Sequence, residues 1–494
     1  MCLKEIHNKE TFFNIDLDKI ALCDISEGIQ ITYGMLINGV IKLKEIIDKN
    51  CISSGSVITI SCKERLHQAL YLICGLNLPY TINPLDPDYS EEELNKILLH
   101  SETKLIISDK LSIKEGRDIV IIEPDVSNIC KTSQKIPDLN LDIRGKLLIY
   151  TSGTTGNPKG VLLSSTNIIK NTNEAIYLFG YNSSWITASV LPMFHTFTLI
   201  SDIIPVIRMG GKCVICKAFN AITSRNLKTA LKQEKIKSFS AVPIIFQAIN
   251  ALFEPEDTNS LKFTISGAAP LSEKVRLDFF SKFNRHIIPC YGLSETTCFA
   301  TITPFQFIKP RTVGKPAGIS IRVVDTNENE MDLPLGEIGE IIMKGDSVIQ
   351  SGYYNDTMQK ECYTVSGYFR TGDLGYFDSE GYLYIAGRRK NMVIRGGKKV
   401  YLEDVDQCIE ELNWVKESVS VAILQADKLD SAITFVIVQN FKANIKEEII
   451  HHIDSKLNSI HIPDQINIVD EIPRTKTGKP KIENLKNLIL SYDN

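Results

Sequence analysis

The sequence lacks any long hydrophobic run. No stretch of about eighteen apolar residues is uninterrupted, and the N-terminal segment MCLKEIHNKETFF has no apolar core of the length that a signal peptide needs. We therefore expect a cytoplasmic protein without a transmembrane segment. A strong excess of charge is also missing, because 55 Lys and Arg face 59 Asp and Glu for a net charge of −4. The lysines are scattered, which excludes the basic stripe of a nucleic-acid-binding protein and favours small anionic ligands.

Cysteine pairs suited to a metal are scarce as well. Among 12 cysteines, only Cys213 and Cys216 have the CxxC spacing, and no second pair completes a zinc site. They lie in the β-rich run GGKCVICKAF, where residues three apart point to opposite faces of a strand. In a reducing compartment, cysteines are more often small buried hydrophobes than bridges. We therefore predict a structural role for this pair.

The length and the patterning predict more than one domain. A chain of 494 residues that is 43% hydrophobic can bury a large core. Helical and strand patterns alternate up to about residue 300, which predicts a layered α/β body. From Thr312, short strands punctuated by glycine and proline predict a small β-barrel at about residues 311–386. The α/β alternation then returns, and we predict an N-terminal domain at residues 1–388 and a C-terminal domain at residues 389–494.

A glycine-rich loop, YTSGTTGNPKGV at residues 150–161, follows the strand pattern of residues 146–150. This order places the loop at the carboxyl end of a strand, where open α/β sheets bind ligands. Glycines let backbone N–H groups approach a phosphate, hydroxyls add donors, and a lysine adds a full charge. The residues concerned are Thr151, Ser152, Gly153, Thr154, Thr155, Gly156, Lys159 and Gly160. We interpret the loop as a triphosphate cradle, with a mobile surface loop as the alternative.

This cradle differs from that of an ordinary P-loop ATPase. A Walker loop needs a serine or threonine directly after its lysine, where the hydroxyl binds magnesium. Here Pro158 precedes Lys159 and Gly160 follows it. The sequence therefore lacks the main feature that would indicate a P-loop ATPase.

Six further motifs follow the loop in a fixed order. They are LPMFHTF at 191–197, SGAAP at 266–270, YGLSETT at 291–297, YFRTGDLG at 368–375, GRRKNMVIRGG at 387–397 and PRTKTGK at 473–479. Together with the loop, this order resembles the adenylate-forming (AMP-binding) superfamily, which includes acyl- and aryl-CoA synthetases, peptide-synthetase adenylation domains and firefly luciferase. The resemblance covers nearly the whole chain. It implies an α/β fold with a large N-terminal domain of layered subdomains and a small β-barrel, hinged to a small mobile α+β C-terminal domain.

The resemblance implies roles for single residues at the nucleotide. Asp373 resembles the carboxylate that binds the ribose hydroxyls, and Arg388 resembles its companion arginine. Glu295 resembles the magnesium carboxylate, because hard cations prefer oxygen ligands; a helix cap is the alternative. Lys479 resembles the lysine that bridges the substrate carboxylate and the α-phosphate, with a solvated cation as the alternative. The adenine wall and a phosphate-binding hydroxyl correspond to Gly267, Ala268, Ala269, Tyr291, Gly292 and Ser294.

A second set of residues resembles the parts that serve the thiol. Lys390 stands where the family has its hinge, and Gly396 and Gly397 resemble the loop that lines the pantetheine channel after the small domain swings. Two departures bear on that second pose. Leu402 replaces a common proline, and Asn391 stands where aspartate is frequent.

His195 in LPMFHTF bears on the substrate. Acyl- and aryl-CoA synthetases also carry histidine there, whereas amino-acid-activating relatives usually carry an aspartate for the α-amino group. A buried ammonium without a carboxylate partner is costly, so we expect a substrate without an α-amino group, with His195 gating the carboxylate and the thiol. The expected pocket, residues 190–198 and 241–246, is apolar and aromatic, which favours a fatty or aromatic acid.

These residues predict an ATP- and Mg²⁺-dependent ligase that joins a carboxylic acid to a thiol through an acyl-adenylate. Two unit charges about 4 Å apart repel by about 1 kcal/mol in water and about 4 near a protein surface, so cations must bring the carboxylate to the triphosphate. The thiol belongs either to coenzyme A or to the phosphopantetheine of an acyl or peptidyl carrier protein. A non-catalytic nucleotide or acyl sensor requires the loss of Lys479, Glu295 or Asp373, and all three are present.

Overall fold

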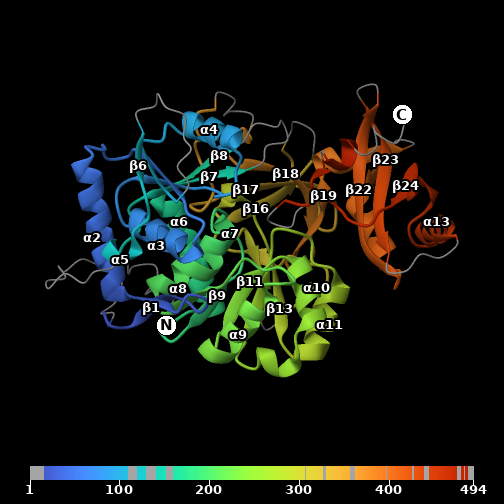
Figure 1. The fold of residues 1–494 in the computed structure, drawn as a ribbon. Coiled ribbons are helices and arrows are strands. Elements are labelled where there is room, and N and C mark those ends of the chain that lie inside the picture. Colours follow the sequence, from blue (N-terminus) through green and yellow to red (C-terminus); the bar gives the residue numbers. More distant parts are fainter. Residues whose placement is uncertain are drawn as a thin grey trace. The chain divides into compact units, whose positions relative to one another are not determined.

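The structure is a computed structural model (Figure 1). It describes residues 16–109, 119–129, 141–151, 159–305, 307–325, 330–356, 362–395, 398–425, 428–438, 444–475, 480–482 and 484–487. By their internal contacts, the residues form two compact units. The first unit comprises Met1–Pro310, Gly314–Ser320 and Lys344–Phe369, and the second comprises Arg311–Val313, Ile321–Met343 and Arg370–Asn494. In the described part of the chain, no helix has both the length and the apolar character needed to span a membrane.

The first unit contains two mainly parallel sheets. The larger sheet runs in the order β15 (Lys315–Pro316), β14 (Thr301–Ile302), β13 (His286–Tyr291), β12 (Phe263–Ser266), β11 (Ser238–Ala241), β9 (Ile186–Ser189), β10 (Lys212–Ile215), β1 (Ile20–Asp24) and β2 (Ile29–Thr32). The smaller sheet runs β6 (Val120–Ile122), β5 (Leu105–Ser108), β3 (Val57–Ser61), β4 (Thr81–Pro84), β7 (Lys146–Thr151) and β8 (Lys159–Leu163). Only the edge pairs β1–β2, β7–β8, β13–β14 and β14–β15 are antiparallel among these described strands.

Helices connect and cover these sheets, as parallel strands require (Figure 1). They are α2 (Tyr33–Lys49), α3 (Arg65–Leu76), α4 (Glu91–His100), α5 (Val126–Ile129), α6 (Ser165–Phe179), α7 (Thr196–Thr198), the π-helix η1 (Leu199–Ile203), α8 (Ile204–Arg208), α9 (Ser224–Glu234), α10 (Pro243–Leu252), the 3₁₀ helix η2 (Pro255–Thr258), α11 (Glu273–Phe283) and the 3₁₀ helix η3 (Ser294–Thr296). Local chemistry sets several ends. Ser90 and Glu93 form a capping box that starts α4, and Gly180 in the left-handed conformation ends α6.

Cys213 lies within β10, and Cys216 directly follows this strand. Cys213 stands opposite Leu22 and Thr187 in the parallel ladder, and both cysteine side chains are buried. Burial raises the pKa of the Cys216 thiol to about 12, so the thiol stays protonated at neutral pH. Both therefore behave as small apolar side chains within the sheet.

The second unit contains most of a four-stranded sheet and the C-terminal elements. The sheet runs β16 (Ser320–Val324), β17 (Gly339–Lys344), β18 (Phe369–Phe377) and β19 (Leu383–Arg388). The C-terminal elements are η5 (Arg389–Asn391), the hairpin β20 (Met392–Arg395) and β21 (Lys398–Tyr401), α12 (Leu402–Glu410), β22 (Val415–Gln425), β23 (Lys428–Val438), α13 (Ile445–Lys456), η6 (Ser459–His461) and β24 (Gln465–Ile468). Strands β22, β23 and β24 form one sheet, and a core that includes Leu402 and Val405 of α12 packs with it.

The expected β-barrel is not closed in the described residues. Strands β16 and β19 are the two ends of the four-stranded order, so the sheet stays open. The outer edge of β19 meets another segment instead, because the N–H of Val313 donates to the carbonyl of Leu383 at 3.0 Å. The contacts also group this sheet with the C-terminal residues, whereas the sequence places it with the N-terminal domain. The boundary at residues 388 and 389 stays a prediction.

Candidate active site

The loop at Gly267 to Ala269 follows β12 at the carboxyl edge of the larger sheet. Ladder pairs Ala241 with Ser266 and Ser266 with Pro289 show that β11, β12 and β13 end together. Open α/β sheets bind ligands outside this edge. Ala268 has a φ of 65°, a left-handed conformation that is uncommon for a residue with a side chain and is often found at functional sites. The structure thus places the predicted adenine-wall loop at the carboxyl edge of the sheet.

Two glycines make this edge compact. A Cβ on Gly267 would lie 2.9 Å from the Sγ of Cys290 and 3.1 Å from the Cζ of Phe197. A Cβ on Gly292 would lie 1.6 Å from the carbonyl oxygen of Cys298. Phe197 belongs to the LPMFHTF motif, so this motif and the loop at Gly267 are in direct contact within the first unit.

His195 is half-buried at the start of α7, and its ring centroid lies 4.5 Å from that of Phe194. The carbonyl of His195 accepts a 3.4 Å bond from the N–H of Leu199, which begins the π-helix η1. Such π-turns are rare and frequently occur at functional sites. The fold therefore brings His195, through Phe197 of the same motif, to the edge that also carries Gly267.

A buried carboxyl group close in sequence to the LPMFHTF motif was missed by sequence reasoning. Asp202 of η1 is fully buried, and the hydroxyl of Ser240 on β11 donates to its Oδ1 at 2.7 Å. Its Oδ2 has no hydrogen-bond partner among the described residues. Burial raises the pKa of Asp202 well above its ordinary value, which favours the protonated form. The apolar run around Asp202 carried no signal that this acid faces the core.

Glu295 points its carboxylate at a tyrosine from a distant segment. The hydroxyl of Tyr353 donates to Glu295 Oε1 at 2.7 Å. The alternative role of a helix cap is filled by a neighbour, because Thr296 Oγ1 accepts the N–H of Leu293 at 2.9 Å. The side chains of Thr296 and Thr297 are buried, which fixes the turn that presents Glu295.

The cradle loop is anchored at both ends by the β7–β8 ladder. Thr151 ends β7 and stands opposite Lys159, which begins β8. Lys159 Nζ lies 4.8 Å from the ring centroid of Tyr353, the same ring whose hydroxyl binds Glu295. Predicted cradle residues Ser152, Gly153, Thr154, Thr155 and Gly156 lie outside the described residues. Lys159 and Glu295, far apart in the sequence, are thus joined through one tyrosine that sequence reasoning missed.

In the second unit, Asp373 and Arg388 form an ion pair. The antiparallel ladder of β18 and β19 places these two residues opposite each other, and Arg388 Nε lies 2.9 Å from Asp373 Oδ1. Asp373 is 4% exposed, whereas the side chain of Arg388 is half in solvent. The Oγ1 of Thr371 accepts the N–H of Asp373 at 3.0 Å and donates to the carbonyl of Ile341 at 2.6 Å. The predicted ribose carboxylate is therefore held rigidly.

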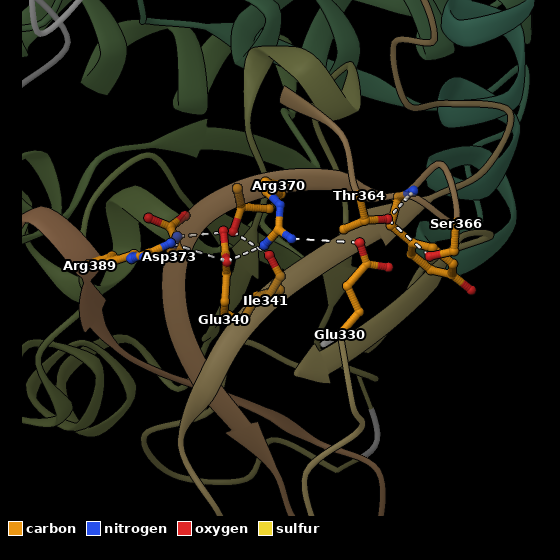
Figure 2. Close-up of polar contacts among 10 residues, drawn as sticks. Glu330, Glu340, Ile341, Thr364, Ser366, Arg370, Asp373 and Arg389 are labelled. Carbon is orange, nitrogen blue, oxygen red and sulfur yellow. Dashed lines mark hydrogen bonds and ion pairs between the residues drawn. The ribbon is translucent and has the colours of Figure 1, made fainter. Parts of the chain in front are cut away.

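A charge network continues from this pair along the sheet. Figure 2 shows the guanidinium of Arg370 between the carboxylates of Glu340 and Glu330. The Arg370–Glu340 contact is 2.7 Å, and Arg389 approaches the same glutamate at 3.7 Å. Glu340 is 2% exposed, so its charge needs these cations. None of these residues was predicted, because charged residues in strands usually face solvent.

The predicted hinge lies in η5, which holds Lys390. Its neighbour Asn391 donates from Nδ2 to Glu403 Oε1 at 3.2 Å and accepts the N–H of Ala422 at 3.2 Å. The side chain of Asn391 thus links α12 to β22 by hydrogen bonds. This is the position at which the resemblance leads us to expect aspartate. Leu402, in place of the common proline, is fully buried at the start of α12.

The predicted C-terminal lysine and thiol-channel glycines, Lys479, Gly396 and Gly397, lie outside the described residues. The loop that carries Lys479 is nevertheless closed at its base. Arg474 and Pro480 form an antiparallel bridge, and the N–H of Lys481 donates to the carbonyl of Pro473 at 2.8 Å. Arg474 also forms an ion pair with Glu417 of β22.

Comparison with protein-family models identifies the chain. The model of the AMP-binding enzyme matches residues 15–354, and the model of the AMP-binding enzyme C-terminal domain matches residues 404–479. The chain belongs to the AMP-binding enzyme family. The first match alone spans more than half of the 494 residues.

Similar proteins place this AMP-binding enzyme among CoA ligases. The sulfoacetate–CoA ligase of Cupriavidus necator is 25% identical over 484 residues, which cover 94% of this chain and 93% of that protein. The long-chain-fatty-acid–CoA ligase of Bacillus subtilis is 29% identical over 355 residues, which cover 70% of this chain and 62% of that protein. The crystal structure of ATP-bound MatB from Rhodopseudomonas palustris superposes with a TM-score of 0.88 at 23% identity, covering 100% of this chain and 99% of the other.

These matches confirm the resemblance to the adenylate-forming superfamily and its acyl-CoA synthetase branch. They also confirm the α/β fold with a large N-terminal and a smaller C-terminal domain. The roles of individual site residues stay predictions.

Proposed function

We propose that this AMP-binding enzyme activates a fatty or aromatic acid with ATP and transfers the acyl group to the thiol of coenzyme A. The observation that carries the proposal is the pairing of Lys159 with Glu295 around Tyr353, at the base of the cradle. A cation for phosphate and a carboxylate for a metal are what a reaction between two anions requires. The same unit contains Phe197 of the expected apolar pocket, which lies against Gly267.

The residues present fit a magnesium ion. Mg²⁺ keeps several waters and usually takes only one or two protein carboxylates together with substrate phosphates. Glu295 offers one half-buried carboxylate, and the described residues contain no cluster of three or more acidic, histidine or cysteine ligands. When bound, the ion would neutralise phosphate charge that develops on the leaving pyrophosphate.

In the first step, a carboxylate oxygen of the acid attacks the α-phosphorus of ATP, and pyrophosphate leaves. Lys159 would hold the departing phosphates, and Lys479 would bridge the carboxylate and the α-phosphate. Asp373, held by Arg388 and Thr371, would accept the ribose hydroxyls as a carboxylate acceptor. These residues position reactants and offset charge, without taking a proton.

In the second step, the thiol gives up its proton to solvent, its sulfur attacks the acyl carbonyl carbon, and AMP leaves with the electrons of the acyl–oxygen bond. His195, at the edge near Gly267, would gate access of the carboxylate and the thiol. Coenzyme A is the proposed acceptor because the similar proteins described above are named as CoA ligases. A carrier-protein thiol has the same reacting group.

The acyl group is proposed from the pocket wall. Met193 and Phe197 of the expected acyl pocket are buried apolar side chains. A monocarboxylic acid with an apolar body fits this wall best.

A substrate panel tests the proposal. The enzyme is incubated with ATP, Mg²⁺ and acetate, hexanoate, palmitate, benzoate, indoleacetate or sulfoacetate. Pyrophosphate release and mass spectrometry then report the acyl-adenylate, and added CoA or a holo-carrier protein reports the acceptor. We expect turnover with an apolar acid and a CoA thioester. Absence of pyrophosphate with every acid would contradict the activity, and a mass shift only on the carrier would change the acceptor.

A further inference from the structure

Tyr353 touches two residues of the proposed site with different parts of its side chain. Its hydroxyl donates to Glu295 Oε1 at 2.7 Å, and its ring face lies 4.8 Å from Lys159 Nζ. All three residues belong to the first unit. A hydrogen bond to a carboxylate and a cation–π contact are both among the stronger interactions that a neutral side chain can make.

The backbone around Tyr353 is bonded to both elements that carry these partners. The N–H of Ile349 donates to the carbonyl of Glu295 at 2.8 Å, and the N–H of Tyr354 donates to the carbonyl of Gly160 at 2.7 Å. Gly352, at a φ of 72°, turns the chain between them. The segment therefore ties η3 to β8 and fixes the side chain of Tyr353 between them.

The chemistry of the two groups fixes the direction of this hydrogen bond. An ionised carboxylate can only accept, so the phenol hydroxyl of Tyr353 is the donor to Glu295.

A direct ion pair between Glu295 and Lys159 would work against catalysis, because each charge would neutralise the other before metal or phosphate arrived. Tyr353 engages them separately. Its hydrogen bond to Oε1 restricts the rotation of the Glu295 carboxylate. Its ring attracts the ammonium by its quadrupole without consuming an N–H donor, so the donors remain for phosphate oxygens.

We propose that Tyr353 is a positioning residue, whose hydroxyl aims Glu295 at Mg²⁺ and whose ring holds Lys159 at the nucleotide phosphates. The inference rests on the proposed function, since it needs a metal–nucleotide complex at this site. Partners that orient metal ligands typically contribute ten- to hundredfold to metal affinity.

Two substitutions separate the two contacts. Tyr353→Phe removes the hydroxyl and keeps the ring, so only the magnesium-dependent part of nucleotide affinity should fall, by about tenfold. Tyr353→Leu removes both, so affinity for the metal-free nucleotide should fall as well. Tyr354→Phe is the matched control, because the hydroxyl of Tyr354 donates to the carbonyl of Ser101, at 3.4 Å, rather than to a residue of the proposed site.

The readout is calorimetric binding of a non-hydrolysable ATP analogue to the full chain, with Mg²⁺ and with EDTA. A thermodynamic cycle adds Glu295→Gln, whose amide oxygen still accepts the tyrosine bond but binds metal poorly. If the hydroxyl acts through the carboxylate, the double variant should lose no more magnesium-dependent affinity than Glu295→Gln alone.

The outcomes are distinguishable. Unchanged binding by Tyr353→Phe, or equal losses with and without Mg²⁺, would overturn the positioning role and leave the proposed function intact. A wild-type protein that binds no nucleotide in either condition would overturn the proposed function itself. Should Tyr353→Leu fail to fold, the phenylalanine variant and the cycle still decide the role of the hydroxyl.

Discussion

Gly292 shows how little space separates the segments of the site. Its absent Cβ would lie 1.6 Å from the backbone carbonyl of Cys298, which cannot rotate away as a side chain can. We expect Gly292→Ala to destabilise the protein by at least about 2 kcal/mol, at the upper part of the range for overpacking. Gly267→Ala should cost less, because it meets the movable ends of Cys290 and Phe197. Chemical denaturation of both variants checks the order, and equal losses would contradict it.

At the same scale, Asp373 should matter for binding more than for folding. Asp373→Asn removes the charge that pairs with Arg388 and would accept the ribose hydroxyls. Hydrogen bonds to charged groups contribute about 1.5–3 kcal/mol, so AMP affinity should fall by about ten- to hundredfold. Asp332→Asn is the control, since its 2.7 Å pair with Arg322 lies on the same sheet and is largely exposed. Calorimetry with AMP measures both, and comparable losses would argue against the assigned role.

At the scale of elements, the hydrophobic patterns of the sequence predicted the strands that are buried on both faces. The predicted alternation includes the apolar runs at residues 56–61 and 104–108, which form β3 and β5. The short strands β14 and β15 were not predicted, because two residues are too few to show a periodicity. The sequence patterns also did not show that the sheet of β16 to β19 stays open instead of closing into a barrel. The outer edge of β19 could pair with β16 or with Val313, and these distant segments compete for it. The alternation of side chains along one strand does not show which segment pairs there.

Helix α12 carries three acids on one face, Glu403, Asp406 and Glu410, that pack toward β22. Burial raises their pKa values to about 7, about 6 and about 7. Ser418 and Ser420 donate to Asp406, Asn391 donates to Glu403, and Arg474 lies near Glu410. A raised carboxyl pKa means that the folded state binds the proton more tightly than the unfolded state.

The raised pKa values set the direction in which the local stability of α12 and β22 changes with pH. Local stability of α12 and β22 should fall as pH rises from about 4.5, where unfolded carboxyls ionise, to about 7, and then level off. Amide hydrogen exchange of the full chain at pH 5.5 and 8 measures this. Glu403→Gln should flatten the dependence and slow exchange at pH 8. Faster exchange at the lower pH, after correction for intrinsic rates, would show the opposite sign.

At the scale of the whole molecule, two chemical steps should be separable. Lys479 is predicted to act only while the carboxylate meets the α-phosphate, so Lys479→Ala should lower acid-dependent pyrophosphate exchange by at least about a hundredfold. Thioester formation from a supplied acyl-adenylate should change little. Lys481→Ala, an exposed neighbouring cation, serves as the control. Full pyrophosphate exchange by the Lys479 variant would remove the lysine from the mechanism.

The sequence by itself determined the family, the α/β class and the residue types at the site, because motif order, hydrophobic periodicity and turn chemistry are local properties of the chain. Only the tertiary structure decided which of these residues meet. Tyr353 reaches Glu295 across 58 positions of sequence, and Asp202, an acid in an apolar run, is fully buried. Both depend on sheet order and on packing between distant segments, which set distances and dielectric surroundings that no local pattern contains.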